Sequence, residues 1–137
     1  MFEKYIKFGL SVSLIDGKKK VSGFPTGWQK LTESVYNGEL NFGILTGEVN
    51  DIVVLDLDVN KDTGVLLSKD WFNTNFFDLD NISNYPTLVT RTISGGYHVY
   101  YKYNKRLRTR LNIDNLKVDL LSENRCVIEG KNYLVLS

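Results

Sequence analysis

The sequence predicts an α+β fold in which a largely antiparallel sheet is flanked by helices. Roughly six or seven short segments are rich in Val, Ile, Tyr and Phe, which favour strands. Turns of hairpin length separate many of these segments, and such turns join antiparallel neighbours. Only about three segments place apolar residues at helical spacing. With 137 residues, the chain has the length of one domain.

The first predicted elements are a helix over residues 2–8, a strand over residues 12–15 and a short helix that begins near Trp28. In both helices the apolar side chains recur every three to four residues. The sequence Asn37-Gly38 is a typical end for the second helix. The strand between the two helices is the apolar segment VSLI.

Two strands, residues 42–47 and 51–59, are expected next, joined by a short polar turn. Thr63 is placed to cap a helix over about residues 64–74. The inward face of this helix would carry Leu66, Leu67 and Trp71.

The second half of the chain is predicted to be a loop followed by four strands. Residues 73–86 are polar and acidic and end at Pro86, which argues against a regular element. The strands are expected at residues 87–93, 97–103, 116–121 and 125–137.

Composition narrows the possible functions. The net charge of +1 gives no general affinity for polyanions, so a nucleic-acid site would need local clusters of charge. The single cysteine, Cys126, excludes an intrachain disulfide and fits a reducing, intracellular compartment. No apolar run approaches the ~20 residues of a membrane span, and the first residues do not resemble a signal peptide.

The segment VVLDLDVNKDTG carries oxygen-rich side chains at alternate positions, namely Asp56, Asp58, Asn60 and Asp62. An EF-hand loop needs glycine at its sixth position and glutamate at its twelfth. Counted from Asp56, these positions hold Lys61 and Leu67, and counting from Asp58 fails as well. The sequence therefore argues against a calcium loop.

Asp56 and Asp58 are expected on the same face of a strand, with α-carbons about 6.5–7 Å apart. Such a pair can bracket two divalent cations. A strand that simply ends in solvent would also contain aspartates. The apolar run that precedes the pair favours a central strand, whose carboxylates would be partly buried and would need a partner such as a metal.

Three further features could carry chemistry. Ser94, Gly95 and Gly96 precede His98, the only histidine, and could cradle a polyphosphate or form a plain hairpin. Asp119 interrupts an apolar strand and could be a third metal ligand or an ordinary aspartate on an edge strand. A basic segment next to tyrosines could bind nucleic acid or be a solvated loop. Its cations are Lys102, Lys105, Arg106, Arg108 and Arg110.

The order of these motifs, VVLDLD, then TISGGYH, then KVDLL, resembles the primase-polymerase domain of the archaeo-eukaryotic primase superfamily, as found in viral, phage and plasmid replication proteins. The segments YIKFGLSVSLIDGKKK, FPTGWQK and NFGILTGEVNDIVVLDLD are also similar to that family. The resemblance covers nearly the whole chain and implies an RRM-like catalytic core.

The resemblance implies template-directed nucleotidyl transfer on single-stranded DNA. Asp56, Asp58 and Asp119 would bind two Mg²⁺ or Mn²⁺ ions. The triphosphate of the incoming nucleotide would be held by Ser94, Gly95, Gly96 and His98. Asn124 and Arg125 are similar to a basic patch that follows the third motif in some members.

Residues 1–137 are therefore expected to be one catalytic domain and a fragment of a larger replication protein. Replication proteins of this kind often contain a helicase domain as well. Two other functions stay open at this point. A metal-dependent nuclease also clusters Asp and His, and a non-catalytic module could bind single-stranded nucleic acid on its sheet. The carboxylates favour an enzyme, because a binding sheet does not need acids that face a polyanion.

Overall fold

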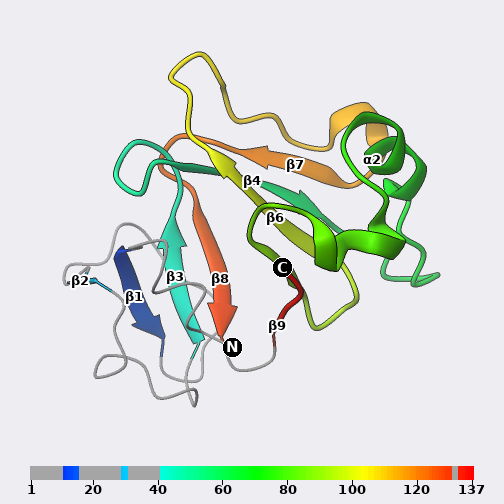
Figure 1. The fold of residues 1–137 in the computed structure, drawn as a ribbon, viewed down its shortest axis with the longest axis horizontal. Helices are drawn as coiled ribbons and strands as arrows, with labels where there is room; N and C mark the ends of the chain where they lie inside the picture. Colours follow the sequence, from blue (N-terminus) through cyan, green and yellow to red (C-terminus); the bar gives the residue numbers. More distant parts are fainter. Residues whose placement is uncertain (1–10, 16–28, 31–40, 131–132) are drawn as a thin grey trace.

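In the computed structural model, the described part of the chain comprises residues 11–15, 29–30, 41–130 and 133–137 (Figure 1). The elements in chain order are β1 (Ser11–Ile15), β2 (Gln29–Lys30), β3 (Asn41–Leu45), β4 (Ile52–Leu57), the helix α2 (Lys69–Asn75), the 3₁₀ helix η1 (Leu79–Asn84), β5 (Val89–Arg91), β6 (Tyr97–Lys102), the 3₁₀ helix η2 (Ile113–Asn115), β7 (Val118–Leu121), β8 (Cys126–Gly130) and β9 (Leu134–Val135). This content confirms the predicted α+β class.

The described strands form two antiparallel sheets (Figure 1). The smaller sheet has the order β2-β1-β3-β8, and the larger has the order β7-β4-β6-β5-β9. The turn after β3 leads to β4, as predicted, but the two strands meet only at an isolated bridge between Gly47 and Ile52. The chain therefore passes from one sheet to the other at this turn.

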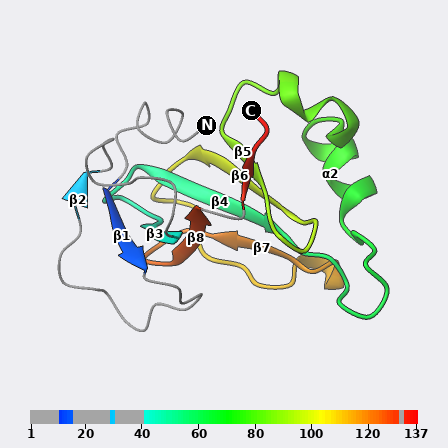
Figure 2. The same cartoon turned by 90° about the horizontal axis from the view of Figure 1, so that it is seen from below.

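Each face of the larger sheet covers a hydrophobic core. On one face, Val54 and Tyr100 pack against Phe42, Ile44 and Val127 of the smaller sheet. On the other face lie α2 and η1, which contribute Phe72, Leu79 and Ile82 to a second core. Figure 2 shows α2 beside the larger sheet, at the end away from β1 and β3. The two cores hold β4 and β6 rigidly in the middle of the molecule.

Two predicted elements in the N-terminal region fall on or near residues outside the described part. The helix over residues 2–8 lies entirely outside it. The prediction of a short helix after Trp28 is wrong at the two residues that the structure describes, because Gln29 and Lys30 form β2 and pair with β1. The strand predicted at 12–15 is confirmed as β1.

The helix predicted over residues 64–74 begins later, at Lys69. The side chain of Asn60 accepts the N–H groups of Asp62 and Thr63, at 2.9 and 3.2 Å, so this segment closes into a turn. Gly64 then takes a left-handed conformation, with φ of +70°. Thr63 belongs to this turn, and Leu67 is exposed instead of facing inward.

The loop predicted at residues 73–86 contains the end of α2 and the whole of η1. The side chain of Asp78 accepts the N–H of Asp80 and caps η1. Leu79 and Ile82 are buried in the second core, so apolar residues within a polar segment order it. The strands predicted after this segment are confirmed, and the last of them is divided into β8 and β9.

Candidate functional site

Three of the predicted site residues, Asp56, His98 and Asp119, occupy one row across the larger sheet. Asp119 of β7 lies opposite Asp56 of β4, Asp56 lies opposite His98 of β6, and His98 lies opposite Thr90 of β5. Residues directly opposite each other in antiparallel strands place their side chains on the same face. This is the face that packs against the smaller sheet, because Val54 and Tyr100 belong to the core between the sheets.

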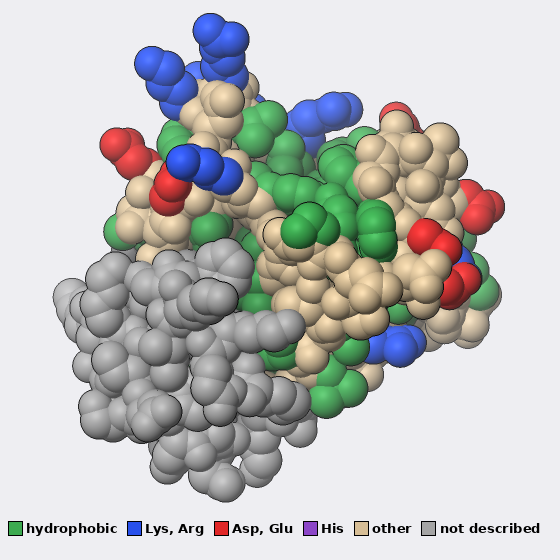
Figure 3. All heavy atoms as spheres, in the orientation of Figure 1, with side chains coloured by type: hydrophobic (Ala, Val, Ile, Leu, Met, Phe, Trp, Pro, Cys, Tyr) green, Lys and Arg blue, Asp and Glu red, His purple; other side chains and the backbone are tan. Residues whose placement is uncertain are grey.

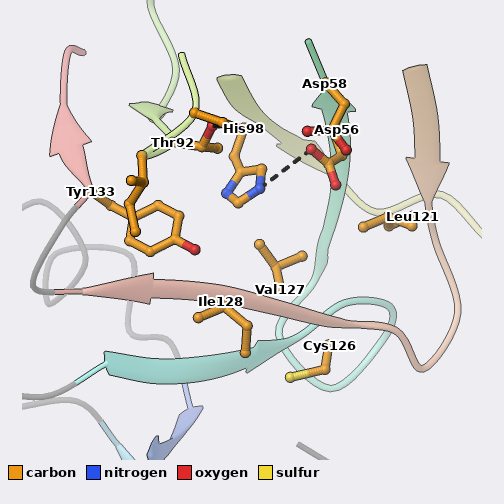
Figure 4. Close-up of a pocket in the computed structure, with 11 residues that line it drawn as sticks. Asp56, Asp58, Thr92, His98, Leu121, Cys126, Val127, Ile128 and Tyr133 are labelled. Carbon is orange, nitrogen blue, oxygen red and sulfur yellow. Dashed lines mark hydrogen bonds and ion pairs between the residues drawn. The ribbon is translucent and has the colours of Figure 1, made fainter. Parts of the chain in front are cut away.

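A cavity of about 230 Å³ lies at this row, between the two sheets (Figure 4). It is lined by Asp56, Asp58, Thr92, Ile93, Ser94, His98, Leu121, Cys126, Val127, Ile128 and Tyr133. Asp58 follows the last residue of β4, and its N–H donates to the carbonyl of Lys117 at 2.9 Å. Asp58 also borders a second cavity, of about 500 Å³, which Asp119 and Lys117 line. Asp58 thus borders both cavities, whereas Asp56 lines the first and Asp119 lines the second.

The carboxylates repel each other. Burial, followed by the nearby charge of Asp56, raises the pKa of Asp58 above its usual range, and the charge of Asp119 adds to this effect. In the described residues, no group of three or more His, Cys, Asp or Glu side chains is close enough to hold a metal. One oxygen of Asp119 instead accepts the N–H of Asn112, at 2.7 Å.

These residues nevertheless fit a divalent cation in chemistry and placement. Mg²⁺ and Mn²⁺ prefer carboxylate oxygens as ligands. Asp56 and Asp58 border the same cavity, and Asp119 is the direct neighbour of Asp56 across the sheet. A cation would relieve the repulsion that raises the pKa of Asp58.

Replacement of Asp58 by asparagine is expected to raise the melting temperature of the metal-free domain by a few degrees at most. A raised pKa means that the folded state favours the protonated carboxyl, so stability is lost as the pH rises through that pKa. At neutral pH the ionised group is therefore unfavourable, and asparagine removes the charge. Thermal melts in EDTA at pH 7.5 and at pH 4 test this.

The gain in melting temperature from Asp58→Asn should shrink at pH 4, where the wild-type carboxyl is itself partly protonated. Asp62→Asn is the matched control, because Asp62 is exposed on the turn after β4. A decrease in stability for Asp58→Asn at neutral pH would contradict the electrostatic description of this site.

The segment from Thr92 to Gly96 forms a tight turn against the end of β4. The N–H of Gly95 donates to the carbonyl of Thr92, and the N–H of Gly96 donates to its hydroxyl, both at 3.0 Å. A β-carbon on Gly96 would lie 2.2 Å from the carbonyl oxygen of Leu57. The absence of a side chain at Gly96 thus lets the turn approach the strand between its two aspartates. As a result, Ser94 borders the same cavity as those aspartates.

His98 is buried and lies between two carboxylates. Its Nε2 is 3.4 Å from Oδ1 of Asp56, and its Nδ1 is 3.2 Å from Oε1 of Glu129. Burial disfavours the charged ring, but Glu129 and Asp56 outweigh it and raise the pKa of His98 to about 10. The two carboxylates therefore favour the imidazolium form of the ring. On the side of the cavity opposite Asp56, the ring of Tyr133 stacks with it at 6.0 Å (Figure 4).

Sequence analysis missed Glu129 and Tyr133. Glu129 belongs to β8 in the smaller sheet and is completely buried. The sequence did contain a signal for Glu129. In the strand CVIEG, side chains alternate between the two faces, so Glu129 shares the core-facing side with Val127. An acid at such a position requires polar partners. Nothing in the local sequence near Tyr133 indicated that its ring would reach His98.

Asn124 and Arg125 lie in the turn between β7 and β8 and are not among the residues that line the cavity, although Leu121 and Cys126 at the two ends of this turn are. Their N–H groups donate to the carbonyl and to the hydroxyl of Thr46, at 3.2 and 3.1 Å. This turn follows Leu121, which lies opposite Val54, so it is at the other end of β4 from Asp58. The role of these residues in nucleotide binding stays a prediction.

The five cations of the basic segment are exposed, and their positions differ. Lys102 is 3.9 Å from a carboxylate oxygen of Asp51, and Arg108 is 2.9 Å from one of Glu123. Figure 3 shows Lys and Arg side chains gathered at the top of the view, over the loop that follows β6. The segment then returns along β7, where the backbones of Arg110 and Leu120 pair at 2.8 and 3.0 Å. This pairing brings the basic segment next to Asp119.

The site places acidic side chains and a cationic histidine in one row, beside a glycine turn. Such a site is suited to phosphate chemistry with divalent cations. The sequence model of the Prim-Pol family, described as bifunctional DNA primase/polymerase, N-terminal, matches residues 16–136. The chain belongs to this family. A search among curated proteins gave no match.

Membership assigns the chain to the proteins of DNA priming and polymerisation, whose substrates are nucleotides and a DNA template. It also confirms the family expected from the order of the motifs. Among the described helices, none has the length and apolar character needed to cross a membrane. The match does not assign roles to individual residues, and the RRM-like core stays a prediction.

Proposed function

We propose that this domain synthesises primers on single-stranded DNA by metal-dependent nucleotidyl transfer at the cavity between the sheets. The observation that carries the proposal is the row of Asp119, Asp56 and His98 on three adjacent strands. Family membership supports the reaction class. The order of the motifs further supports a place in the replication protein of a viral or mobile-element genome, together with a helicase domain or subunit.

Asp56, Asp58 and Asp119 are the residues that would hold two Mg²⁺ or Mn²⁺ ions. When bound, two such ions stabilise the attacking and leaving oxygens of an in-line displacement. The larger sheet fixes the spacing of the ligands, because Asp56 and Asp119 are direct cross-strand neighbours. Asp56 is only partly exposed, which limits access of water to this carboxylate and strengthens its interaction with a cation.

Ser94, Gly95, Gly96 and His98 would hold the triphosphate of the incoming nucleotide. The 3′-hydroxyl oxygen of the growing strand forms a bond to the α-phosphorus and gives its proton to solvent, the bond to the bridging oxygen breaks, and pyrophosphate leaves. Both ring nitrogens of His98 face carboxylates, so both carry protons. Such a ring can donate to a phosphate oxygen and has no free lone pair with which to remove a proton.

The direct test is primer synthesis on a single-stranded DNA template with Mn²⁺ or Mg²⁺ and labelled nucleotides. Extension products are expected only when metal and nucleoside triphosphate are both present, and comparison of ribo- with deoxynucleotides defines the preferred substrate. Cleavage of the template without nucleotides would instead identify a nuclease. DNA binding that is independent of metal, without either reaction, would identify a non-catalytic module.

Replacement of Lys105, Arg106 and Arg110 by glutamine is expected to weaken binding of single-stranded DNA about equally for all sequences. These side chains are exposed, and contacts between cations and phosphates release counterions. The slope of log affinity against log salt concentration should fall by about 2, since each contact on single strands contributes about 0.7. Fluorescence anisotropy over a range of NaCl concentrations measures it.

Lys69→Gln serves as the control for these glutamine variants. Lys69 is exposed on α2 and is 3.4 Å from Asp80, so removal of its charge should leave the salt dependence unchanged. An unchanged slope for the triple variant would exclude the basic segment from the DNA site.

A further inference from the structure

Glu129 is the centre of a buried polar network that joins the two sheets. The hydroxyl of Thr90 donates to its carboxylate at 2.7 and 3.0 Å, and the hydroxyl of Tyr100 donates at 2.6 Å. Nδ1 of His98 is 3.2 Å from Oε1. The two hydroxyls come from β5 and β6, whereas Glu129 comes from β8. Three donors on the larger sheet therefore hold one acceptor of the smaller sheet.

The network fixes the orientation of the His98 ring. A carboxylate can only accept hydrogen bonds, so Nδ1 of His98 must be the donor to Glu129. This bond leaves Nε2 on the opposite edge of the ring, 3.4 Å from Asp56 and facing the cavity (Figure 4). Tyr133 stacks on the ring and restricts its tilt. The ring thus has one orientation in which its bonds are satisfied.

Stability alone does not account for a glutamate at this position. A fully buried carboxylate loses its hydration, and well-packed apolar residues often serve as well or better in a core. Val127, two residues earlier on the same face of β8, is such a residue. The hydroxyls of Thr90 and Tyr100 aim Glu129 at the one imidazole of the protein, and that imidazole borders the cavity.

We infer that Glu129 is a positioning residue, which holds Nδ1 of His98 so that Nε2 is presented to a phosphate group in the cavity. The phosphate part of this inference rests on the proposed function. The hydrogen bond does not, and it can be tested without nucleotide or metal. Glu129 is not among the residues that line the cavity, and it acts through His98.

The first test is nuclear magnetic resonance of the wild-type protein labelled with ¹⁵N-histidine. His98 is the only histidine in the chain, so every ring signal belongs to it. In EDTA at pH 7, the Nδ1 proton is expected to be visible and to exchange with water more slowly than the Nε2 proton. A ring whose Nδ1 carries no proton, or exchanges the faster of the two, would overturn the inference.

The second test is the Glu129→Gln variant, which keeps the shape of the side chain and removes its charge. A neutral acceptor holds a donor less strongly, so the KM for nucleoside triphosphate is expected to rise about tenfold, with a change in kcat of less than threefold. The Nδ1 proton should exchange faster than in the wild type. An unchanged KM with faster exchange would show that the orientation of His98 has no part in nucleotide binding and would overturn the inference.

Two additional variants complete the experiment. Ile44→Val, in the core between the sheets, is a control for loss of stability and should leave the KM unchanged. If Glu129→Gln does not fold, Tyr100→Phe is the alternative variant, because it removes one hydrogen-bond donor to Glu129. It should raise the KM for nucleoside triphosphate by a smaller factor. An unchanged KM for Tyr100→Phe would count against the inference. Absence of primer synthesis by the wild type would refute the proposed function, while the ring signals of His98 would still decide whether Glu129 holds Nδ1.

Discussion

Replacement of Asp56 by asparagine is expected to reduce metal-dependent primer synthesis on the order of 10³-fold while the domain stays folded. Asp56 is central in the row, with Asp119 on one side and His98 on the other. Asparagine keeps the shape of the side chain but removes the negative charge that a divalent cation needs. The measurement is the initial rate of nucleotide incorporation on a single-stranded template at saturating Mn²⁺, with circular dichroism as a check of folding.

Asp62→Asn is the control for this loss of synthesis, because it makes the same chemical change on the exposed turn that follows β4. It should retain the rate of the wild type. Asp119→Asn should behave like Asp56→Asn if the cross-strand pair acts as one metal site. Full activity of either variant with a folded domain would refute the assignment of these carboxylates.

Replacement of Gly96 by alanine is expected to destabilise the domain by about 1–3 kcal/mol and to reduce primer synthesis about a hundredfold. The added β-carbon would lie 2.2 Å from the carbonyl oxygen of Leu57, which belongs to a central strand and cannot move freely. The turn would have to lift away from β4 and would carry Ser94 with it. Chemical denaturation and the same incorporation assay measure the two effects.

Gly64→Ala is a suitable control for the effect of alanine on folding. Gly64 also lies in a turn, its φ is +70°, and no atom is within 4 Å of a β-carbon placed there. The left-handed conformation should make this variant less stable by about 1–2 kcal/mol, with no loss of synthesis. Comparable activity of Gly96→Ala and Gly64→Ala would mean that close approach of the turn to β4 does not matter for function.

The sequence was sufficient to predict most strands and insufficient to predict how they divide into sheets. Runs of Val, Ile and Tyr identified β3, β4 and β6 because they are buried on at least one face. The pairing of β3 with β8 joins segments that are distant along the chain, and no local pattern encodes it. The helix predicted from Thr63 began too early because the side chain of Asn60 closed a turn there.

The candidate site could be predicted to the extent that its residues lie in short motifs. Asp56 and Asp58 are two positions apart, and His98 is two positions after Gly96, so the patterns marked them as candidates and the order of the motifs gave them roles. Glu129 was missed because its partners are on another sheet. Asn124 was predicted by resemblance to bind the nucleotide, and this role stays a prediction; in the structure its N–H donates to the carbonyl of Thr46. Local sequence patterns thus do not reveal which residues contact each other between the two sheets.

The row of site residues across the larger sheet can form only late in the synthesis of the chain. Asp119 meets Asp56 only when β7 has paired with β4, and Glu129 reaches His98 only when β8 has joined β3. Both late strands must therefore leave the ribosome before the site exists. Pairing of strands that are distant in sequence is slow, so a nascent chain that ends before β8 would have the three aspartates but no assembled cavity. Premature termination in this region should yield an inert product instead of a partly active enzyme.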